Sequence, residues 1–143
     1  MRLDVFLTNG KFLVVTEDTE KILENIVHGK AITSYNVGFD FGKFLYQEPW
    51  NLKWITARRY DIMDLATKKV MSMARSDSIG DKKLQERLLF EEANFPYPNK
   101  WVRSEDAYRV LCPDDPIDLA KQTHRALDDA IMEGWILKAI MEA

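Results

Sequence analysis

A small set of histidine and aspartate side chains could carry out metal-assisted hydrolysis. His124 is one of only two histidines in the 143-residue chain, and the adjacent Asp128 and Asp129 follow it in the best helix pattern of the sequence. Asp40 comes shortly after a predicted strand over residues 31–35. A histidine can move a proton near neutral pH, and carboxylates hold hard divalent ions. These residue types therefore suit hydrolysis by an activated water.

The spacing in the C-terminal stretch limits which of these residues can act together. His124 and Asp129 are five positions apart, which is about 140° around an α-helix. Two residues deep in one helix would diverge at this spacing, so we expect His124 to lie in the loop before the helix. The helix is predicted from about Arg125 to Ala143. We expect its packing face to consist of Leu127, Ala130, Ile131, Gly134, Leu137 and Ile140.

The rest of the sequence predicts strands that alternate with helices. Asn9-Gly10 stands between two β-rich runs over residues 3–16, which is a strong hairpin pattern. A strand end that turns into a helix is predicted over Arg59–Ala66. Further helices are predicted over Lys82–Glu91 and over Ser104–Leu111, the latter capped by Ser104. This order of elements is typical of an α/β domain.

Composition sets the bounds on function. With 46% hydrophobic and 30% charged residues, residues 1–143 are expected to form a single globular domain. No apolar run approaches the roughly 20 residues that span a bilayer, so no membrane association is expected. The single Cys112 cannot form an internal disulfide and has no histidine nearby in sequence, so we expect a cytoplasmic location and no cysteine nucleophile. A net charge of −3 argues against a protein that coats long duplexes, but not against an enzyme that grips a few nucleotides.

Two motifs resemble those of the DEDDh 3′→5′ exonuclease superfamily, which includes the proofreading epsilon subunit and oligoribonuclease. Asn36-Val37-Gly38-Phe39-Asp40 is similar to the second motif of the family, Asn-x-x-Phe-Asp. The stretch from His124 to Asp129 is similar to the third motif, in which a histidine precedes the metal-binding aspartate by five positions. That spacing selects Asp129 and leaves Asp128 to solvent. The resemblance implies a ribonuclease H-like α/β exonuclease domain, with a mixed sheet flanked by helices.

The resemblance also implies an activity. Two Mg²⁺ or Mn²⁺ ions would be held by carboxylates that include Asp40 and Asp129, and His124 would be the general base. The substrate would be a single-stranded 3′ end of DNA or RNA, with release of nucleoside monophosphates. Asn36 and Phe39 are candidates for substrate binding, although a core position for Phe39 is equally open. A polymerase or another replication or repair protein would be a fitting partner, and the sequence leaves the oligomeric state open.

The first motif of the family, Asp-x-Glu in the first strand, has no convincing counterpart. Asp18-Thr19-Glu20 has the right letters, but it lies only 22 residues before Asp40 and suits an acidic helix N-terminus. Asp4-Val5-Phe6 lies in a predicted strand and has Phe6 where the family has glutamate. We therefore expect the domain to lack the first strand of the family and to be N-terminally incomplete relative to it. The alternative is a catalytically incomplete fragment, or a domain of the same fold that binds nucleic acid or a partner without cleaving.

Overall fold

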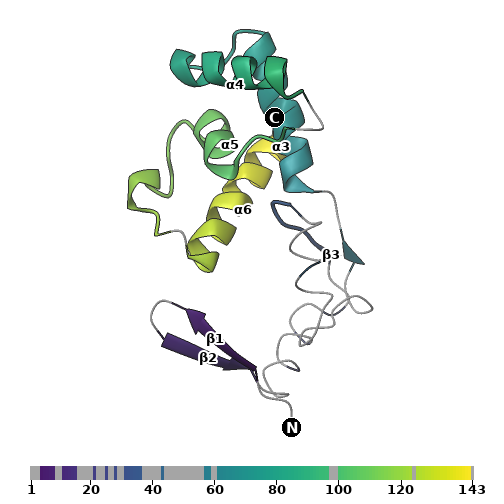
Figure 1. The fold of residues 1–143 in the computed structure, drawn as a ribbon, viewed down its shortest axis with the longest axis vertical. Helices are drawn as coiled ribbons and strands as arrows, with labels where there is room; N and C mark the ends of the chain where they lie inside the picture. The colour runs from purple at the N-terminus through teal and green to yellow at the C-terminus, as the bar shows by residue number, and fades with distance from the viewer. Residues whose placement is uncertain are drawn as a thin grey trace. The chain divides into compact units, whose positions relative to one another are not determined.

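The computed structural model of the protein describes residues 4–8, 11–15, 21, 25, 28, 31–36, 43, 57–58, 61–96, 100–123 and 125–142. The chain forms two compact units (Figure 1). The first comprises Met1–Thr33 and Val37–Arg59, and the second comprises Ser34–Asn36 and Tyr60–Ala143. The candidate residues that the structure describes lie in the second unit.

The described part of the first unit consists mainly of short strands. β1 (Asp4–Thr8) and β2 (Lys11–Val15) pair antiparallel, with Thr8 opposite Lys11. This register confirms the predicted hairpin, because it leaves Asn9-Gly10 as the two-residue connection. β3 (Ala31–Ile32) pairs in parallel with β4 (Ala57–Arg58) over two residues.

The second unit is helical. Its elements are α3 (Ile62–Arg75), α4 (Lys82–Asn94), α5 (Ser104–Leu111), the short 3₁₀ helix η3 (Leu119–Lys121) and α6 (Ala126–Glu142). α3 packs against α4, α5 and α6, and α5 also packs against α6 (Figure 1). The predicted helix over Ser104–Leu111 is confirmed at both ends, although its N-cap is Arg103 and not Ser104. α4 runs three residues further than predicted, and α6 begins within a residue of its predicted start.

The prediction of a ribonuclease H-like α/β domain is wrong. In the part of the chain that the structure describes, the strands form two separate two-stranded pairings, and no mixed sheet flanked by helices is present. The amphipathic helices were expected to cover a sheet, but α3, α5 and α6 bury their apolar sides against one another. β3 and β4 span two residues each, which is too short to supply a hydrophobic sheet face.

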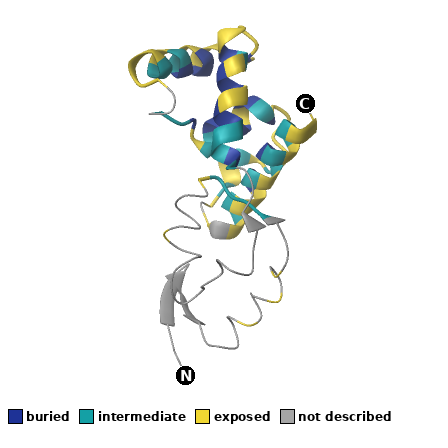
Figure 2. Ribbon diagram, turned by 90° about the vertical axis from the view of Figure 1, so that its right-hand side faces the viewer, coloured by how far each residue is buried: buried dark blue, intermediate teal, exposed yellow. Residues whose placement is uncertain are grey.

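The core of the second unit lies where its helices face one another (Figure 2). Ala66 and Val70 of α3, Tyr108 of α5 and Ile136 of α6 are almost completely buried. The remaining buried apolar side chains include Ile62, Met71, Ala74, Ile79, Leu84, Leu88, Val102, Ala107, Val110, Cys112 and Met132. α3 therefore packs against each of the helices α4, α5 and α6.

The buried face of α6 differs from the predicted one. Met132 and Ile136, four positions apart, face the core and are 2% and 0% exposed. Leu127 and Ile131 of the predicted packing face are 70% and 45% exposed, and Ala130 and Gly134 are exposed as well, so the prediction is wrong for these four residues. Leu137 and Ile140 are partly buried against the core, as predicted.

Aspartate residues are the N-caps of two of the helices. Asp61 is the N-cap of α3, and its carboxylate accepts a hydrogen bond from the Met63 amide at 2.8 Å. Asp81 is the N-cap of α4 and accepts from the Leu84 amide at 3.1 Å. These bonds satisfy amides that have no partner inside the helix. None of the helices in the described ranges is long and apolar enough to cross a membrane.

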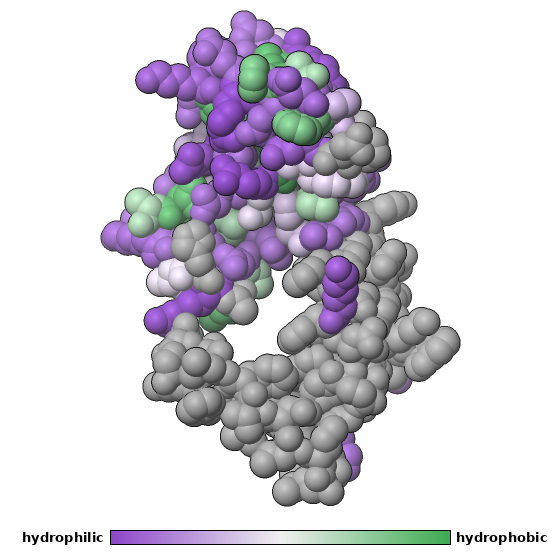
Figure 3. All heavy atoms as spheres, in the orientation of Figure 1, coloured by the Kyte–Doolittle hydropathy of each residue, from purple (hydrophilic) through white to green (hydrophobic). Residues whose placement is uncertain are grey.

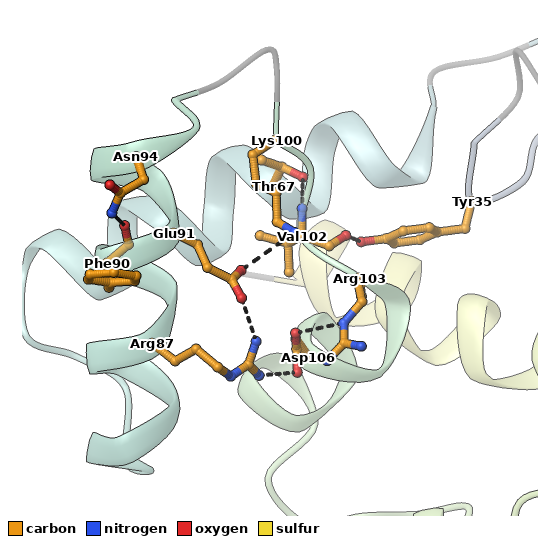
Figure 4. Close-up of polar contacts among 10 residues, drawn as sticks. All are labelled: Tyr35, Thr67, Arg87, Phe90, Glu91, Asn94, Lys100, Val102, Arg103 and Asp106. Atoms are coloured by element: carbon orange, nitrogen blue, oxygen red, sulfur yellow. Dashed lines mark hydrogen bonds and ion pairs between the residues drawn. The ribbon is translucent and has the colours of Figure 1, made fainter.

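A buried carboxylate joins α4 to α5 (Figure 4). Asp106 of α5 accepts from Arg87 Nη2 of α4 at 2.7 Å and from Arg103 Nε at 3.4 Å. Arg87 also pairs with Glu91 at 3.2 Å, within α4. The hydrogen bond that Arg87 donates to Asp106 raises the pKa of the Arg87 guanidinium, so this side chain stays charged.

Candidate functional site

The structure describes two of the five predicted site residues. Asn36 and Asp129 both belong to the second unit. Phe39, Asp40 and His124 lie outside the described residues. The geometry of the site is therefore built from Asp129, from Asn36 and from the elements that hold them.

Asp129 lies in the first turn of α6, where the helix dipole favours a negative charge. Its side chain is half-buried, and Oδ1 accepts a hydrogen bond from Gln122 Nε2 at 2.8 Å. The other oxygen, Oδ2, has no hydrogen-bond or ion-pair partner among the described residues. One oxygen of the carboxylate is thus held in place, and the second can take a further ligand.

The neighbouring acid has a different environment. Asp128 Oδ2 accepts a hydrogen bond from the Thr123 hydroxyl, and Thr123 directly precedes His124. Asp128 also lines an open hollow of about 250 Å³ together with Ile117, Lys121, Gln122 and Ile131. The two adjacent aspartates are therefore tied to two adjacent residues of the loop before α6, one bond to each.

The loop between α5 and α6 is fixed by a buried tyrosine. Tyr108 is 1% exposed, and its hydroxyl donates to Asp115 Oδ1 at 2.8 Å and accepts from the Ile117 amide at 3.1 Å. The same Asp115 oxygen accepts from the Leu119 amide at 2.8 Å. Burial raises the pKa of Tyr108 to about 12, which keeps the hydroxyl protonated as a donor. This network places η3, and with it Gln122, close to the start of α6.

Two aspartates of this loop have left-handed backbone conformations. Asp115 and Asp118 have φ values of 49° and 56°, a region that aspartate tolerates better than most residues. The pattern Pro113-Asp114-Asp115-Pro116 predicts a loop here from sequence alone. The role of Tyr108 in holding the loop had no counterpart in the sequence pattern.

Asn36, the first residue of the predicted second motif, is attached to the start of α3. Its amide donates to Asp61 Oδ1 at 2.9 Å, and its φ of 77° is one that asparagine adopts readily. Two residues earlier, the Ser34 carbonyl accepts from the Ile62 amide at 3.1 Å. Residues 34–36 are therefore hydrogen-bonded to the N-terminal end of α3.

Tyr35 anchors the same segment inside the helical unit (Figure 4). Its hydroxyl donates to the Val102 carbonyl, and Val102 in turn donates its amide to Thr67 Oγ1 at 3.0 Å. Burial, with a smaller contribution from nearby carboxylates that include Glu133, raises the pKa of Tyr35 above its usual range. Glu133 is one turn beyond Asp129 on α6, and Ser34–Asn36 belong to the unit that carries Asp129.

Among the described residues, no three histidine, cysteine or acidic side chains come close enough together to hold a metal ion. Asp129 has the chemistry of a ligand for a hard divalent ion. The buried Oε1 of Gln122 beside it has no hydrogen-bond partner in the described part of the chain. Of the predicted metal ligands, the structure places Asp129 alone, since Asp40 lies outside the described residues.

Cys112 is unsuited to nucleophilic chemistry. The side chain is buried, and its thiol lies 3.6 Å from the Trp135 carbonyl, to which it donates. Burial raises the pKa of the Cys112 thiol, which disfavours the reactive thiolate. This environment agrees with the prediction that Cys112 is not a nucleophile.

Comparison with protein-family models, with curated proteins and with solved structures finds no match to this chain. The resemblance to the DEDDh exonucleases therefore depends on the two motifs themselves. Gln122, which contacts Asp129, belongs to neither motif and was missed at the level of sequence.

Proposed function

We propose that the protein is a metal-dependent 3′→5′ exonuclease that acts on single-stranded 3′ ends and releases nucleoside monophosphates. The observation that supports this most is the setting of Asp129, the aspartate selected by the third-motif spacing. It lies in the first turn of α6 with one oxygen held by Gln122 and the other without a partner among the described residues. This is the arrangement that a metal-binding carboxylate needs.

In this proposal the residues of the chain have separate roles. Asp40 and Asp129 bind Mg²⁺ or Mn²⁺, and His124 removes a proton from the attacking water. The bound ions would supply Lewis-acid stabilisation of the phosphodiester and of the leaving oxygen. Asn36 and Phe39 contact the terminal nucleotide. A reducing, cytoplasmic setting suits the single cysteine, and a polymerase or another replication or repair protein is the proposed partner.

A second candidate is a domain that binds nucleic acid or a partner without cleaving. Two observations favour it: the sequence has only two of the four carboxylates that the resemblance calls for, and α6 exposes apolar side chains. On the face drawn in Figure 3, the surface of the second unit is mostly hydrophilic and is interrupted by small apolar patches. Leu127 and Ile131 of α6, which are one turn apart on the helix, are 70% and 45% exposed. Large exposed apolar side chains that cluster often belong to interaction surfaces.

A single assay separates the two candidates. A 5′-labelled oligonucleotide, DNA or RNA, is incubated with the protein and Mn²⁺, and parallel samples contain EDTA or a complementary strand. The exonuclease proposal predicts a ladder that shortens one nucleotide at a time from the 3′ end, on single strands and only with the metal. A mobility shift of the intact strand without any shortening would support the second candidate instead.

A further inference from the structure

The loop before α6 holds a side chain whose contacts suit a role at the candidate metal site. Gln122 donates a hydrogen bond from Nε2 to Asp129 Oδ1 at 2.8 Å, across seven positions of sequence. An ionised carboxylate only accepts hydrogen bonds, so the amide must present its nitrogen to Asp129. We propose that Gln122 is a positioning residue that fixes the Asp129 carboxylate for metal binding. This inference rests on the proposed exonuclease function.

The backbone of Gln122 is itself held firmly. Gln122 is the C-cap of η3, and its amide donates to the Leu119 carbonyl at 3.1 Å. Leu119 in turn donates to Asp115 at 2.8 Å, and Asp115 is bonded to the buried Tyr108. The amide that meets Asp129 therefore comes from a loop anchored to α5, so it can restrain the carboxylate.

The carbonyl oxygen at the other end of the Gln122 side-chain amide is buried. Gln122 Oε1 is inaccessible to solvent and has no hydrogen-bond partner in the ranges that the structure describes. A buried acceptor without a donor destabilises a protein, so such a group calls for an explanation beyond packing. A hydrogen-bond donor brought in at the occupied site would satisfy it. The amide of Gln122 therefore donates to Asp129 at one end and keeps an acceptor available at the other.

The restraint explains how one carboxylate of an adjacent pair could be selected. Gln122 binds Asp129 Oδ1 and leaves Oδ2 available, whereas Thr123 binds Oδ2 of Asp128. Residues that orient a metal ligand typically change metal affinity by about 10- to 100-fold when they are removed. The chain thus offers a matched pair of hydrogen bonds, of which only one should affect metal binding.

The experiment is a calorimetric titration of the full chain with Mn²⁺, which needs no catalytic activity. Gln122→Met and Thr123→Val each remove one hydrogen bond while keeping the size of the side chain. We expect Gln122→Met to weaken Mn²⁺ binding about 10- to 100-fold and Thr123→Val to leave it close to that of the wild type. Circular dichroism checks that both variants fold, and Gln122→Ala replaces Gln122→Met if the latter does not.

The outcomes separate the inference from the function on which it rests. If Asp129→Asn abolishes Mn²⁺ binding but Gln122→Met and Gln122→Ala bind like the wild type, the positioning role is overturned and the site stands. Equal losses in Gln122→Met and Thr123→Val would also overturn it, because the effect would then be one of general loop structure. If the wild type binds no Mn²⁺, the proposed metal site fails, and the positioning role fails with it.

Discussion

At the scale of single residues, three carboxylates of the second unit each join two separate segments. Asp61 accepts from the amides of Asn36 and Met63, Asp106 from Arg87 and Arg103, and Asp115 from Tyr108 and Leu119. Asp106 is held through both oxygens, and Asp61 and Asp115 each accept their two hydrogen bonds on Oδ1. Because two donors of the fold hold each of these carboxylates, these acids are poor candidates for catalysis. Asp129 differs, since its carboxylate accepts one hydrogen bond, from Gln122, among the described residues.

The ion pair between α4 and α5 gives the first prediction. Asp106 is buried, with 4% of its side chain exposed, and its shorter contact is with Arg87 at 2.7 Å. Arg87→Met removes this partner while keeping the aliphatic stem, and it should lower the free energy of unfolding by about 2–3 kcal/mol. Urea denaturation measures the loss.

Arg103→Met is the matched control for that substitution. The Arg103 side chain is 69% exposed and contacts Asp106 at 3.4 Å, so its removal should cost about 0.5 kcal/mol or less. Equal losses in the two variants would show that Asp106 does not depend on Arg87 in the way that the contact distances indicate.

Tyr108 gives a prediction about pH. Burial raises its pKa to about 12, whereas a tyrosine in the unfolded chain ionises near pH 10. Between these values the unfolded chain loses a proton that the folded protein keeps, so the free energy of unfolding falls as the pH rises. Below about pH 10 the contribution of Tyr108 is fully present.

The measurement is urea denaturation of the wild type and Tyr108→Phe at several pH values between about 9 and 11.5. The variant should be less stable near neutral pH, because it loses the bonds to Asp115 and to the Ile117 amide. Its stability should also depend less steeply on pH in the alkaline range, although Tyr35 still contributes a slope of the same sign. Parallel curves for the two proteins would contradict the assignment.

At the scale of secondary-structure elements, α6 has apolar residues on two sides, of which one is buried. Ile136 is 0% exposed and Ile131 is 45% exposed, although they are the same residue type on the same helix. Ile136→Ala should therefore lower the free energy of unfolding by about 3 kcal/mol, and Ile131→Ala by about 1 kcal/mol or less. Both substitutions change helix propensity equally, so their difference reports burial.

Thermal or urea denaturation of the two variants tests which face of α6 packs. A larger loss for Ile131→Ala than for Ile136→Ala would mean that the originally predicted face, which includes Ile131, is the packed one. The two packing arrangements predict opposite orders of the two losses in the free energy of unfolding, so the test needs only their comparison.

The helices themselves were largely predictable from sequence, and their packing was not. Both ends of the helix over Ser104–Leu111 were predicted correctly, because the acids at its start and its apolar stripe indicate the same helix. The periodicity of α6 predicts a helix just as well, but Leu127 and Ile131 are as apolar as Met132 and Ile136. Which stripe becomes buried depends on the neighbouring helices α3 and α5, and the pattern of one helix contains no information about them.

At the scale of the whole molecule, the mixed sheet was predicted from short β-rich runs, and the described strands form two separate two-stranded pairings instead. The hairpin β1–β2 was predictable because Asn9-Gly10 specifies a turn locally. β3 and β4, by contrast, pair over two residues that are far apart in sequence. Long-range pairing of this kind depends on tertiary contacts, and alternation of residue types does not determine it.

The candidate site was predictable only where a motif marks it. Asp129 follows from its spacing to His124, and it occupies the first turn of α6, which begins at Ala126. Gln122 contacts Asp129 across seven positions of sequence, and Tyr108 holds the loop before α6 through its hydrogen bond to Asp115. Neither contact produces a recognisable pattern in the sequence. The predicted roles of Phe39, Asp40 and His124 lie outside the described residues and stay predictions.

The most direct test of the proposed function compares two adjacent substitutions in the exonuclease assay. Rates of 3′-terminal nucleotide release from a single-stranded oligonucleotide with Mn²⁺ are measured for the wild type, Asp129→Asn and Asp128→Asn. Loss of a metal ligand removes several kcal/mol of transition-state stabilisation, so Asp129→Asn should be slower by about 100-fold or more, and Asp128→Asn should stay within a few-fold of the wild type. Equal rates for the wild type and Asp129→Asn, or no release by the wild type, would contradict the proposed function.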